Sequence, residues 1–201
     1  MSILAGDIFN FPSRLHFHWQ IEKWGWEIGE HTYGKPQVIT NELARLRIGR
    51  YTSIAANVTI VMANHRTDLV STYPFRLCGH LWPEAATGEP DHEARGDVVI
   101  GHDAWIGTGS LILPGAVMGD GAVAAGRAVV RGTVPPYAIV AGNPARVVRY
   151  RFSESIIERL LAIAWWDWDE ALLRQKLPFM MSSNIEKFLD EAEKGDVNVA
   201  R

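Results

Sequence analysis

Residues 100–135 are IGHDAW, IGTGSL, ILPGAV, MGDGAV, AAGRAV and VRGTVP when they are written six at a time. The first position of every frame is apolar, and the fifth is small in every frame except the last, where it is Val134. A repeat of six residues matches neither the 3.6-residue period of an amphipathic helix nor the 3.5-residue period of a coiled coil. It matches a short extended segment followed by a corner, with the first side chain pointing inward. We therefore predict a prism in which three such sides make one coil and successive coils pair in parallel.

An earlier part of the chain shows the same first column. Ile48, Ile54 and Ile60 open three frames that run to His65, and one further frame opens at Ile28. The alternative is a glycine-rich β-sheet protein in which the pattern arose by chance, and the unbroken register of the long block argues against it. In the predicted prism the fifth side chain must be small, because it lies near the corner where neighbouring coils crowd together.

The repeat divides the chain. An aromatic N-terminal segment (1–27) precedes it, and we expect this segment to pack at the end of the prism or on a partner subunit. The prism domain (28–150) carries an insertion of residues 66–97 that lacks the repeat. Insertions of this length in a compact domain are functional or disordered, and the aromatic side chains and prolines here predict an ordered loop that packs on another surface. A helical segment (151–201) ends the chain.

Helical spacing of apolar side chains replaces the repeat after Pro136. Ser153 is the expected N-cap of a first helix. A second helix is expected to follow Asp167 and to stop before Pro178, which cannot donate a backbone hydrogen bond. Ser183 and Glu186 have the spacing of a capping box that opens a third helix. We expect these helices to pack against the last coil.

Composition and charge exclude several classes of protein. The 201 residues include 20 basic and 23 acidic side chains, a net charge of −3, and 47% are hydrophobic. This composition argues against a disordered, collagen-like or coiled-coil chain, and it makes nucleic acid and anionic lipid unexpected partners. We find neither a membrane-length apolar stretch nor an export leader. With Cys78 as the single cysteine, we expect a cytoplasmic protein that is neither exported nor inserted in a membrane.

Six short motifs add a family resemblance to this pattern. Over about residues 28–190 the chain resembles the hexapeptide-repeat acyltransferases, and within them the xenobiotic branch of chloramphenicol- and streptogramin-type acetyltransferases. The motifs are NHRTD (64–68), STYPF (71–75), WIG (105–107), AIVAGNPA (138–145), RFS (151–153) and WWDW (165–168). The resemblance implies a mainly β fold: a left-handed parallel β-helix with a protruding loop and C-terminal α-helices. It also implies a homotrimer with active sites between subunits, in which the loop covers the acceptor pocket of a neighbour.

His65 is the expected catalytic residue. A hydroxyl group is a poor nucleophile at neutral pH, so acyl transfer to it needs a base, and histidine is the best-suited side chain. The xenobiotic acetyltransferases carry their general-base histidine in the same Asn-His context, which implies this role for His65. The alternative is a structural histidine that donates a hydrogen bond to a loop carbonyl. Asp68 is a candidate for orienting the ring, although a loop carboxylate at this spacing more often forms a turn.

Acetyl-CoA is the implied co-substrate, and no metal is expected. By resemblance to the family, its pantetheine arm would lie along the coil corners at Trp105, Thr108 and Gly126. Arg131, Arg146 and Arg149 would meet the nucleotide phosphates. Many relatives have a lysine after the threonine or arginine of the last repeat, whereas this chain has glycine after Arg131, which puts one phosphate contact in doubt.

The leading functional hypothesis is direct O-acetylation of an antibiotic such as chloramphenicol or streptogramin A. A second hypothesis keeps the chemistry but changes the acceptor to a hydroxyl or amino group of a cell-envelope or nucleotide sugar. Zinc-dependent carbonic anhydrases share this β-helix, but they need three convergent histidines, and the histidines here are scattered. A purely structural or binding module is the remaining alternative. An acyl-carrying role for Cys78 is not expected, because no activating partner lies near it in the sequence.

Overall fold

The computed structural model describes residues 12–39 and 43–194. Its internal contacts divide the chain into two compact units, residues 1–150 and 151–201, and each unit is considered by itself. Within the described residues, no helix is long and apolar enough to cross a membrane.

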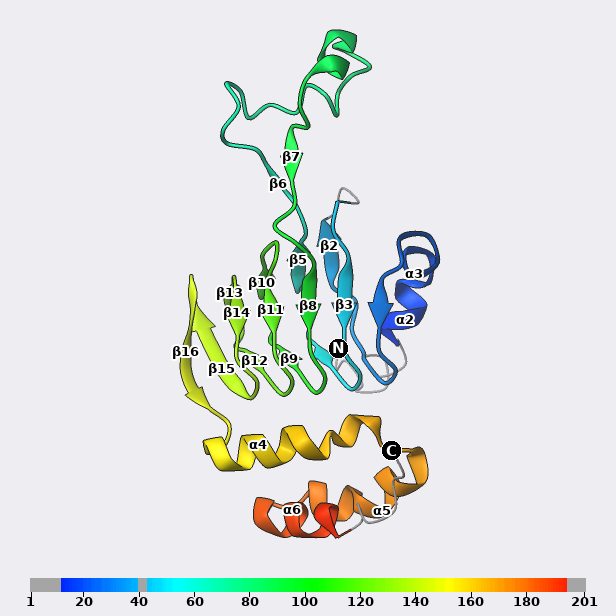
Figure 1. Ribbon diagram of the computed structural model, residues 1–201, viewed down its shortest axis with the longest axis vertical. Coiled ribbons are helices and arrows are strands. Elements are labelled where there is room, and N and C mark those ends of the chain that lie inside the picture. Colours follow the sequence, from blue (N-terminus) through cyan, green and yellow to red (C-terminus); the bar gives the residue numbers. More distant parts are fainter. Residues whose placement is uncertain (1–11, 40–42, 195–201) are drawn as a thin grey trace, which may run out of the picture. The chain divides into compact units, whose positions relative to one another are not determined.

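Three β-sheets, built from the strands of successive coils, form the repeat part of the first unit (Figure 1). Sheet A has the order β16-β15-β12-β9-β4, sheet B the order β1-β3-β8-β11-β14 and sheet C the order β13-β10-β5-β2. All neighbours pair in parallel except β15 and β16. The strands are β1 (Glu27–Ile28), β2 (Gln37–Ile39), β3 (Leu46–Ile48), β4 (Ser53–Ile54), β5 (Thr59–Val61), β8 (Val98–Ile100), β9 (Trp105–Ile106), β10 (Leu111–Ile112), β11 (Val117–Met118), β12 (Val123–Ala124), β13 (Val129–Val130), β14 (Thr133–Val134), β15 (Ala138–Gly142) and β16 (Ala145–Tyr150). The chain thus visits one sheet after another along the repeat, as the six-residue period predicts.

The core of this unit is the predicted first column. Every first-position side chain of the repeat is buried. These residues are Ile28, Ile48, Ile54, Ile60, Ile100, Ile106, Ile112, Met118, Ala124 and Val130. The small fifth-position side chains are buried as well, and the polar one among them, Ser110, donates its hydroxyl to the Gly107 carbonyl oxygen at 2.7 Å. Because each inward side chain contacts the coils above and below it, a coil depends on its neighbours for stability.

The corners require unusual backbone angles. Asn57, Gly109 and Arg127 have positive φ values of 59°, 70° and 60° at equivalent positions between sheets A and C. Gly121 shows why some corners need glycine, since it has a φ of 65° and a Cβ there would lie 2.5 Å from the ring of Tyr137.

Between β5 and β8 the chain leaves the three sheets. We call residues 63–97 the arm; it contains β6 (Asn64–His65), the 3₁₀ helix η1 (Pro83–Thr87) and β7 (His92–Glu93). β6 and β7 pair only with each other, antiparallel, and Figure 1 shows them carrying the arm beyond the ends of β5 and β8. The frame count predicts that His65 is the last residue of a coil, and this prediction is wrong. Because its backbone pairs with His92, His65 belongs to the base of the arm.

The N-terminal segment packs onto the first coil, one of the two places expected for it. It forms α2 (Ser13–His16) and α3 (His18–Trp24), and the rings of Phe17 and Trp26 are buried in the core with their centroids 5.4 Å apart. Partial burial and, next, the nearby charge of Lys35 lower the pKa of His16. The part of the segment before Pro12 lies outside the described residues.

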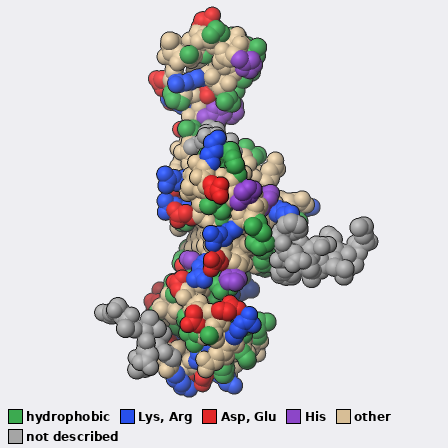
Figure 2. Space-filling model, turned by 90° about the vertical axis from the view of Figure 1, so that its right-hand side faces the viewer, with side chains coloured by type: hydrophobic (Ala, Val, Ile, Leu, Met, Phe, Trp, Pro, Cys, Tyr) green, Lys and Arg blue, Asp and Glu red, His purple; other side chains and the backbone are tan. Residues whose placement is uncertain are grey.

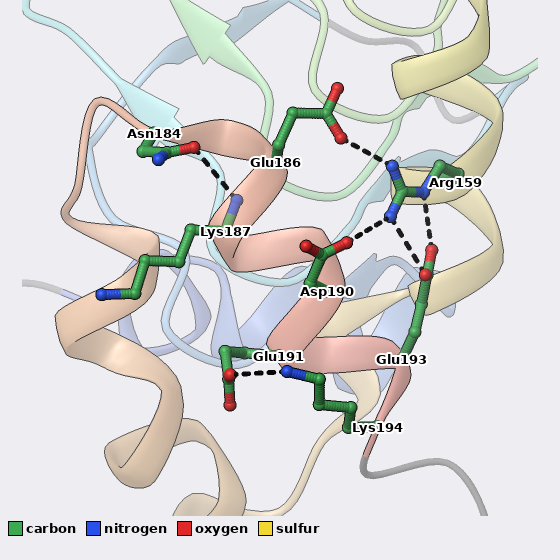
Figure 3. Close-up of polar contacts among 8 residues, drawn as sticks. All are labelled: Arg159, Asn184, Glu186, Lys187, Asp190, Glu191, Glu193 and Lys194. Carbon is green, nitrogen blue, oxygen red and sulfur yellow. Dashed lines mark hydrogen bonds and ion pairs between the residues drawn. The ribbon is translucent and has the colours of Figure 1, made fainter.

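Helices α4 (Glu154–Ile163), α5 (Glu170–Met180) and α6 (Ile185–Glu193) and the 3₁₀ helix η2 (Trp165–Asp167) make up the second unit. Arg159 of α4 joins three carboxylates of α6, those of Glu186, Asp190 and Glu193, at 2.8, 3.4 and 2.7 Å (Figure 3). This cluster connects two helices that are far apart in the sequence.

The expected helix boundaries in this unit need correction. α5 does not stop before Pro178 but includes it, because a proline so near the C-terminal end removes only one backbone hydrogen bond of the last turn. α6 is capped by Asn184, which accepts from the Lys187 N–H, and not by the Ser183–Glu186 capping box. Ser153 occupies the N-cap position of α4 but makes no side-chain cap bond.

Candidate active site

The predicted site residues of the first unit lie in two places. His65 lies at the base of the arm, and most of the residues predicted to bind coenzyme A lie on sheet A and at the corner that follows it. On the face shown in Figure 2, basic and acidic side chains are interspersed rather than gathered by sign.

The His65 ring is exposed and held at one nitrogen. Its Nδ1 lies 2.7 Å from the carbonyl oxygen of Thr72. A carbonyl oxygen can only accept a hydrogen bond, so Nδ1 carries the proton of the neutral ring and Nε2 keeps a free lone pair. This is the bond that the structural alternative for His65 predicts. The same tautomer leaves Nε2 able to accept a proton, as a general base requires.

Asp68, the candidate for orienting the His65 ring, bonds Arg66 instead. Its two carboxylate oxygens accept from Arg66 at 2.9 and 2.6 Å, and this hydrogen-bonded pair lowers the pKa of Asp68. Arg66 also joins Glu89 at 2.6 Å. Arg66 therefore ties the outgoing and returning sides of the arm together through Glu89, and Asp68 supports this arginine.

His92 and Asp91 are neighbours of His65 that sequence reasoning missed. His92 stands directly opposite His65 in the β6–β7 pair, and the two ring centroids are 4.4 Å apart. Asp91 accepts from His92 Nδ1 at 2.8 Å. Partial burial acts to raise the pKa of Asp91, but hydrogen bonds from the Leu77 N–H and from His92 outweigh it and lower the pKa. The only sequence signal for this contact is the register of a hairpin, which the irregular arm sequence does not reveal.

Trp105 stands on the outer face of sheet A and is 54% exposed. Ser53, Trp105, Val123, Ile139 and Arg149 are consecutive register partners across this sheet, so their side chains share one face. Three strand spacings separate Trp105 from Arg149, which is about 14 Å.

A groove of about 560 Å³ opens beside the indole ring of Trp105. Tyr33, Lys35, Asn57 and Thr108 contribute to its wall. It thus places Trp105 and Thr108, two of the predicted residues, in one concave surface. Sequence reasoning did not identify the other three, because they come from earlier coils whose repeat pattern is weaker.

Gly126 lies at the corner beyond this groove. The neighbouring Arg127 N–H donates to the Thr108 carbonyl oxygen at 2.9 Å, which stacks the two corners. A Cβ at Gly126 would meet only the Thr108 carbonyl oxygen, at 3.4 Å, whereas a Cβ at Gly107 would lie 2.6 Å from the backbone nitrogen of Gly126. Packing therefore requires glycine at 107 but not at 126.

The three predicted arginines do not lie together. Arg146 and Arg149 are both on β16, opposite Ala141 and Ile139 of sheet A, and both are exposed. Arg131 is also exposed but lies at another corner, between β13 of sheet C and β14 of sheet B. The structure brings Arg146 and Arg149 to the sheet that carries Trp105 and does not bring Arg131 there.

A second groove, of about 620 Å³, lies on sheet B near the first coil and was not expected from the sequence. Its wall includes Arg14, Arg47 and Arg50. Glu27, Glu30 and Asp97 form ion pairs with them at 3.3 to 3.6 Å. Since these arginines already face carboxylates, the groove offers a phosphate group less unbalanced positive charge than Arg146 and Arg149 offer.

Comparison with known proteins identifies the family. No family model matches the chain. A chloramphenicol acetyltransferase of Agrobacterium fabrum is 42% identical over 144 residues, which cover 70% of this chain and 68% of that protein. A virginiamycin A acetyltransferase of Staphylococcus aureus is 44% identical over 144 residues, covering 71% and 65%. A lipopolysaccharide-biosynthesis O-acetyltransferase homologue of Escherichia coli is 34% identical over 106 residues, covering 51% and 48%. The chain therefore belongs to the hexapeptide-repeat acyltransferases, in the xenobiotic acetyltransferase branch, and is an acetyltransferase.

Proposed function

We propose that this acetyltransferase transfers an acetyl group from acetyl-CoA to a hydroxyl group of a xenobiotic such as chloramphenicol or streptogramin A, with His65 as the general base. The names of its relatives support this class of acceptor. The observation that carries the catalytic role is the hydrogen bond from His65 Nδ1 to the Thr72 carbonyl oxygen at 2.7 Å, because it leaves an exposed ring with an unprotonated Nε2.

Acetyl-CoA supplies an acyl group activated as a thioester. His65 Nε2 accepts the proton of the acceptor hydroxyl while the hydroxyl oxygen forms a bond to the acyl carbon and the carbon–sulfur bond breaks. The imidazolium then returns the proton to the departing thiolate, so that the free thiol and the neutral histidine remain. The Thr72 carbonyl stabilises the imidazolium by accepting the hydrogen bond from Nδ1.

The outer face of sheet A fits the donor. Trp105 and Thr108 would contact the pantetheine arm, and Gly126, where packing does not require glycine, would let that arm approach the backbone closely. Arg146 and Arg149 would bind the phosphates. Arg131 would contribute less than these two, because it lies at another corner.

The assembly proposed is a homotrimer of left-handed β-helices with active sites between subunits. In it the arm protrudes from the prism domain (28–150) and covers the acceptor pocket of a neighbour. The exposed aromatic cluster of Tyr73, Phe75 and Trp82, with ring centroids 4.8 to 5.3 Å apart, supports such a contact, because packing on a neighbour would remove apolar surface from water. We place this trimer in the cytoplasm, where a single cysteine stays reduced.

The test is release of free thiol from acetyl-CoA, followed colorimetrically with chloramphenicol and with streptogramin A. His65→Ala should lower kcat by about 10² to 10⁴-fold. His18→Ala is the matched control, because this exposed histidine lies on α3 and not in the arm, and it should keep the wild-type rate. A His65→Ala enzyme with unchanged kcat would remove His65 from the mechanism.

A sugar acceptor is the second candidate, favoured by the similarity to a lipopolysaccharide-biosynthesis O-acetyltransferase homologue. The same assay with amino sugars and nucleotide sugars separates the two. Thiol release with a sugar but with neither antibiotic would replace the xenobiotic acceptor and leave the role of His65 intact.

A further inference from the structure

His92 is held more firmly than the histidine it faces. Its side chain is 16% exposed and that of its partner Asp91 is 13% exposed, whereas His65 is exposed. Asp91 uses one carboxylate oxygen for His92 Nδ1, at 2.8 Å, and the other for the Leu77 N–H, at 3.0 Å. The Asp91 backbone carbonyl also accepts from the Arg66 N–H at 3.0 Å. His92 is thus tied to both the outgoing and the returning parts of the arm.

The hydrogen bond from His65 Nδ1 does not by itself fix the ring plane. It sets the tautomer, but an exposed side chain with one partner can still tilt about that bond. The second constraint is the ring of His92, which is in register across β6 and β7 with its centroid 4.4 Å away and its plane tilted by 46°. The His92 ring on one side and the hydrogen bond to Thr72 at one edge together restrict the direction in which His65 Nε2 points.

We propose that His92, held by Asp91, is a positioning residue that fixes the plane of the His65 ring and so the direction in which Nε2 takes the proton. The inference rests on the proposed role of His65 as the base. His92 acts through His65 and contacts neither acetyl-CoA nor the acceptor. A misplacement of about 1 Å at a reacting group can cost about 100-fold in rate, so a loose ring lowers kcat without weakening substrate binding.

The experiment is a double-mutant cycle read by thiol release. His92→Ala should lower kcat by about tenfold while the KM values for acetyl-CoA and for the acceptor stay within about twofold. In the His65→Ala background the same change should have no further effect, because the ring that it positions is gone. His92→Phe, which keeps a ring but loses the bond to Asp91, should give a kcat between those of His92→Ala and the wild type. His18→Ala, on α3 outside the arm, is the control.

Each contrary outcome is distinct. Equal losses from His92→Ala in the presence and absence of His65 would assign His92 a general structural role and overturn the inference. An unchanged kcat in His92→Ala, or equal losses of kcat in His92→Ala and His92→Phe, would also overturn the positioning role of His92. In these cases the proposed function stands if His65→Ala is inactive. Wild-type kcat in His65→Ala would overturn the proposed function, and the inference with it.

Discussion

The coils and the arm of this acetyltransferase are built in opposite ways. In the coils every first-position side chain of the repeat is buried, whereas no residue between Ala63 and Asp97 reaches that level of burial. The arm is held by polar contacts such as those of Arg66 and Asp91 and by an aromatic cluster that remains exposed. The coils take their stability from apolar burial, which is non-directional and cumulative. The arm instead depends on a few directed bonds, and it carries the proposed base.

This difference predicts that stability and activity respond to different substitutions. Changes in the coils should lower the free energy of unfolding, and changes in the arm should lower the rate. Four tests, ordered from the largest expected effect to the smallest, examine that separation.

The largest expected effect is in the core of the coils. Ile112→Ala removes a fully buried side chain between β5 and β13 and should lower the free energy of unfolding by about 2 to 5 kcal/mol. Chemical denaturation measures it. The kcat of the protein that remains folded should match the wild type, and a lower kcat per folded molecule would break the separation.

The second test compares two corner glycines. Gly107→Ala forces a Cβ to 2.6 Å from a backbone nitrogen and should cost about 1 to 3 kcal/mol of stability. Gly126→Ala meets only ordinary contact and should leave the melting temperature unchanged while raising the KM for acetyl-CoA. If Gly126→Ala left KM unaltered, the proposed path of the pantetheine arm would be wrong.

The third test concerns the phosphate contacts. Arg149→Met should raise the KM for acetyl-CoA by about tenfold, equivalent to about 1.4 kcal/mol, and Arg146→Met should act similarly. Arg131→Met should change it less, because Arg131 lies at another corner. Arg174→Met, in the second unit, is the control and should have no effect. A larger effect at Arg131 than at Arg149 would reverse the assignment.

The smallest effect is expected in the arm. Arg66→Met removes the partner of Asp68 and Glu89 and should change the free energy of unfolding little, because these ion pairs are at the surface. It should nevertheless speed proteolysis within the arm.

The pH dependence of proteolysis is a second test of the Arg66–Asp68 ion pair. Because Arg66 lowers the pKa of Asp68, their ion pair contributes at pH values above the usual carboxyl pKa and is lost as the pH falls through the lowered one. Protection of the wild-type arm from an acid-tolerant protease should persist in mild acid and disappear only in stronger acid. The variant should lack this protection at every pH, and equal pH profiles would show that Arg66 does not hold the arm.

The coils could be predicted from the sequence because their packing is periodic. Ile100, Ile106 and Ile112 recur at one spacing, and the same spacing fixes their burial and the parallel pairing of their strands. Trp105 and Thr108 were instead chosen by the family resemblance, and they lie on sheet A and at the corner that follows it. The C-terminal helices were found by their apolar stripes, but the ends of α5 and α6 were not, because a late proline is tolerated and Asn184 competes with Ser183 as a cap.

The arm could be predicted only in part, because no period relates its two strands. The motif around His65 identified that residue, but nothing in the sequence pairs it with His92, which follows 27 positions later by residue number. Asp68 was the less favoured candidate for orienting His65, and it does not do so, since the nearby Arg66 competes for the carboxylate more strongly than an imidazole does.

The reversal of direction at β16 bears on how the molecule avoids growing into a fibre. A stack of similar coils can in principle be continued by another coil. Its open end presents unpaired backbone groups with which the first coil of another copy could pair. β16 turns back along β15, and with Arg146 and Arg149 on it, sheet A ends in an antiparallel, charged strand. A second molecule that adds to β16 cannot continue the parallel register of sheet A, so β16 ends the parallel pairing of that sheet.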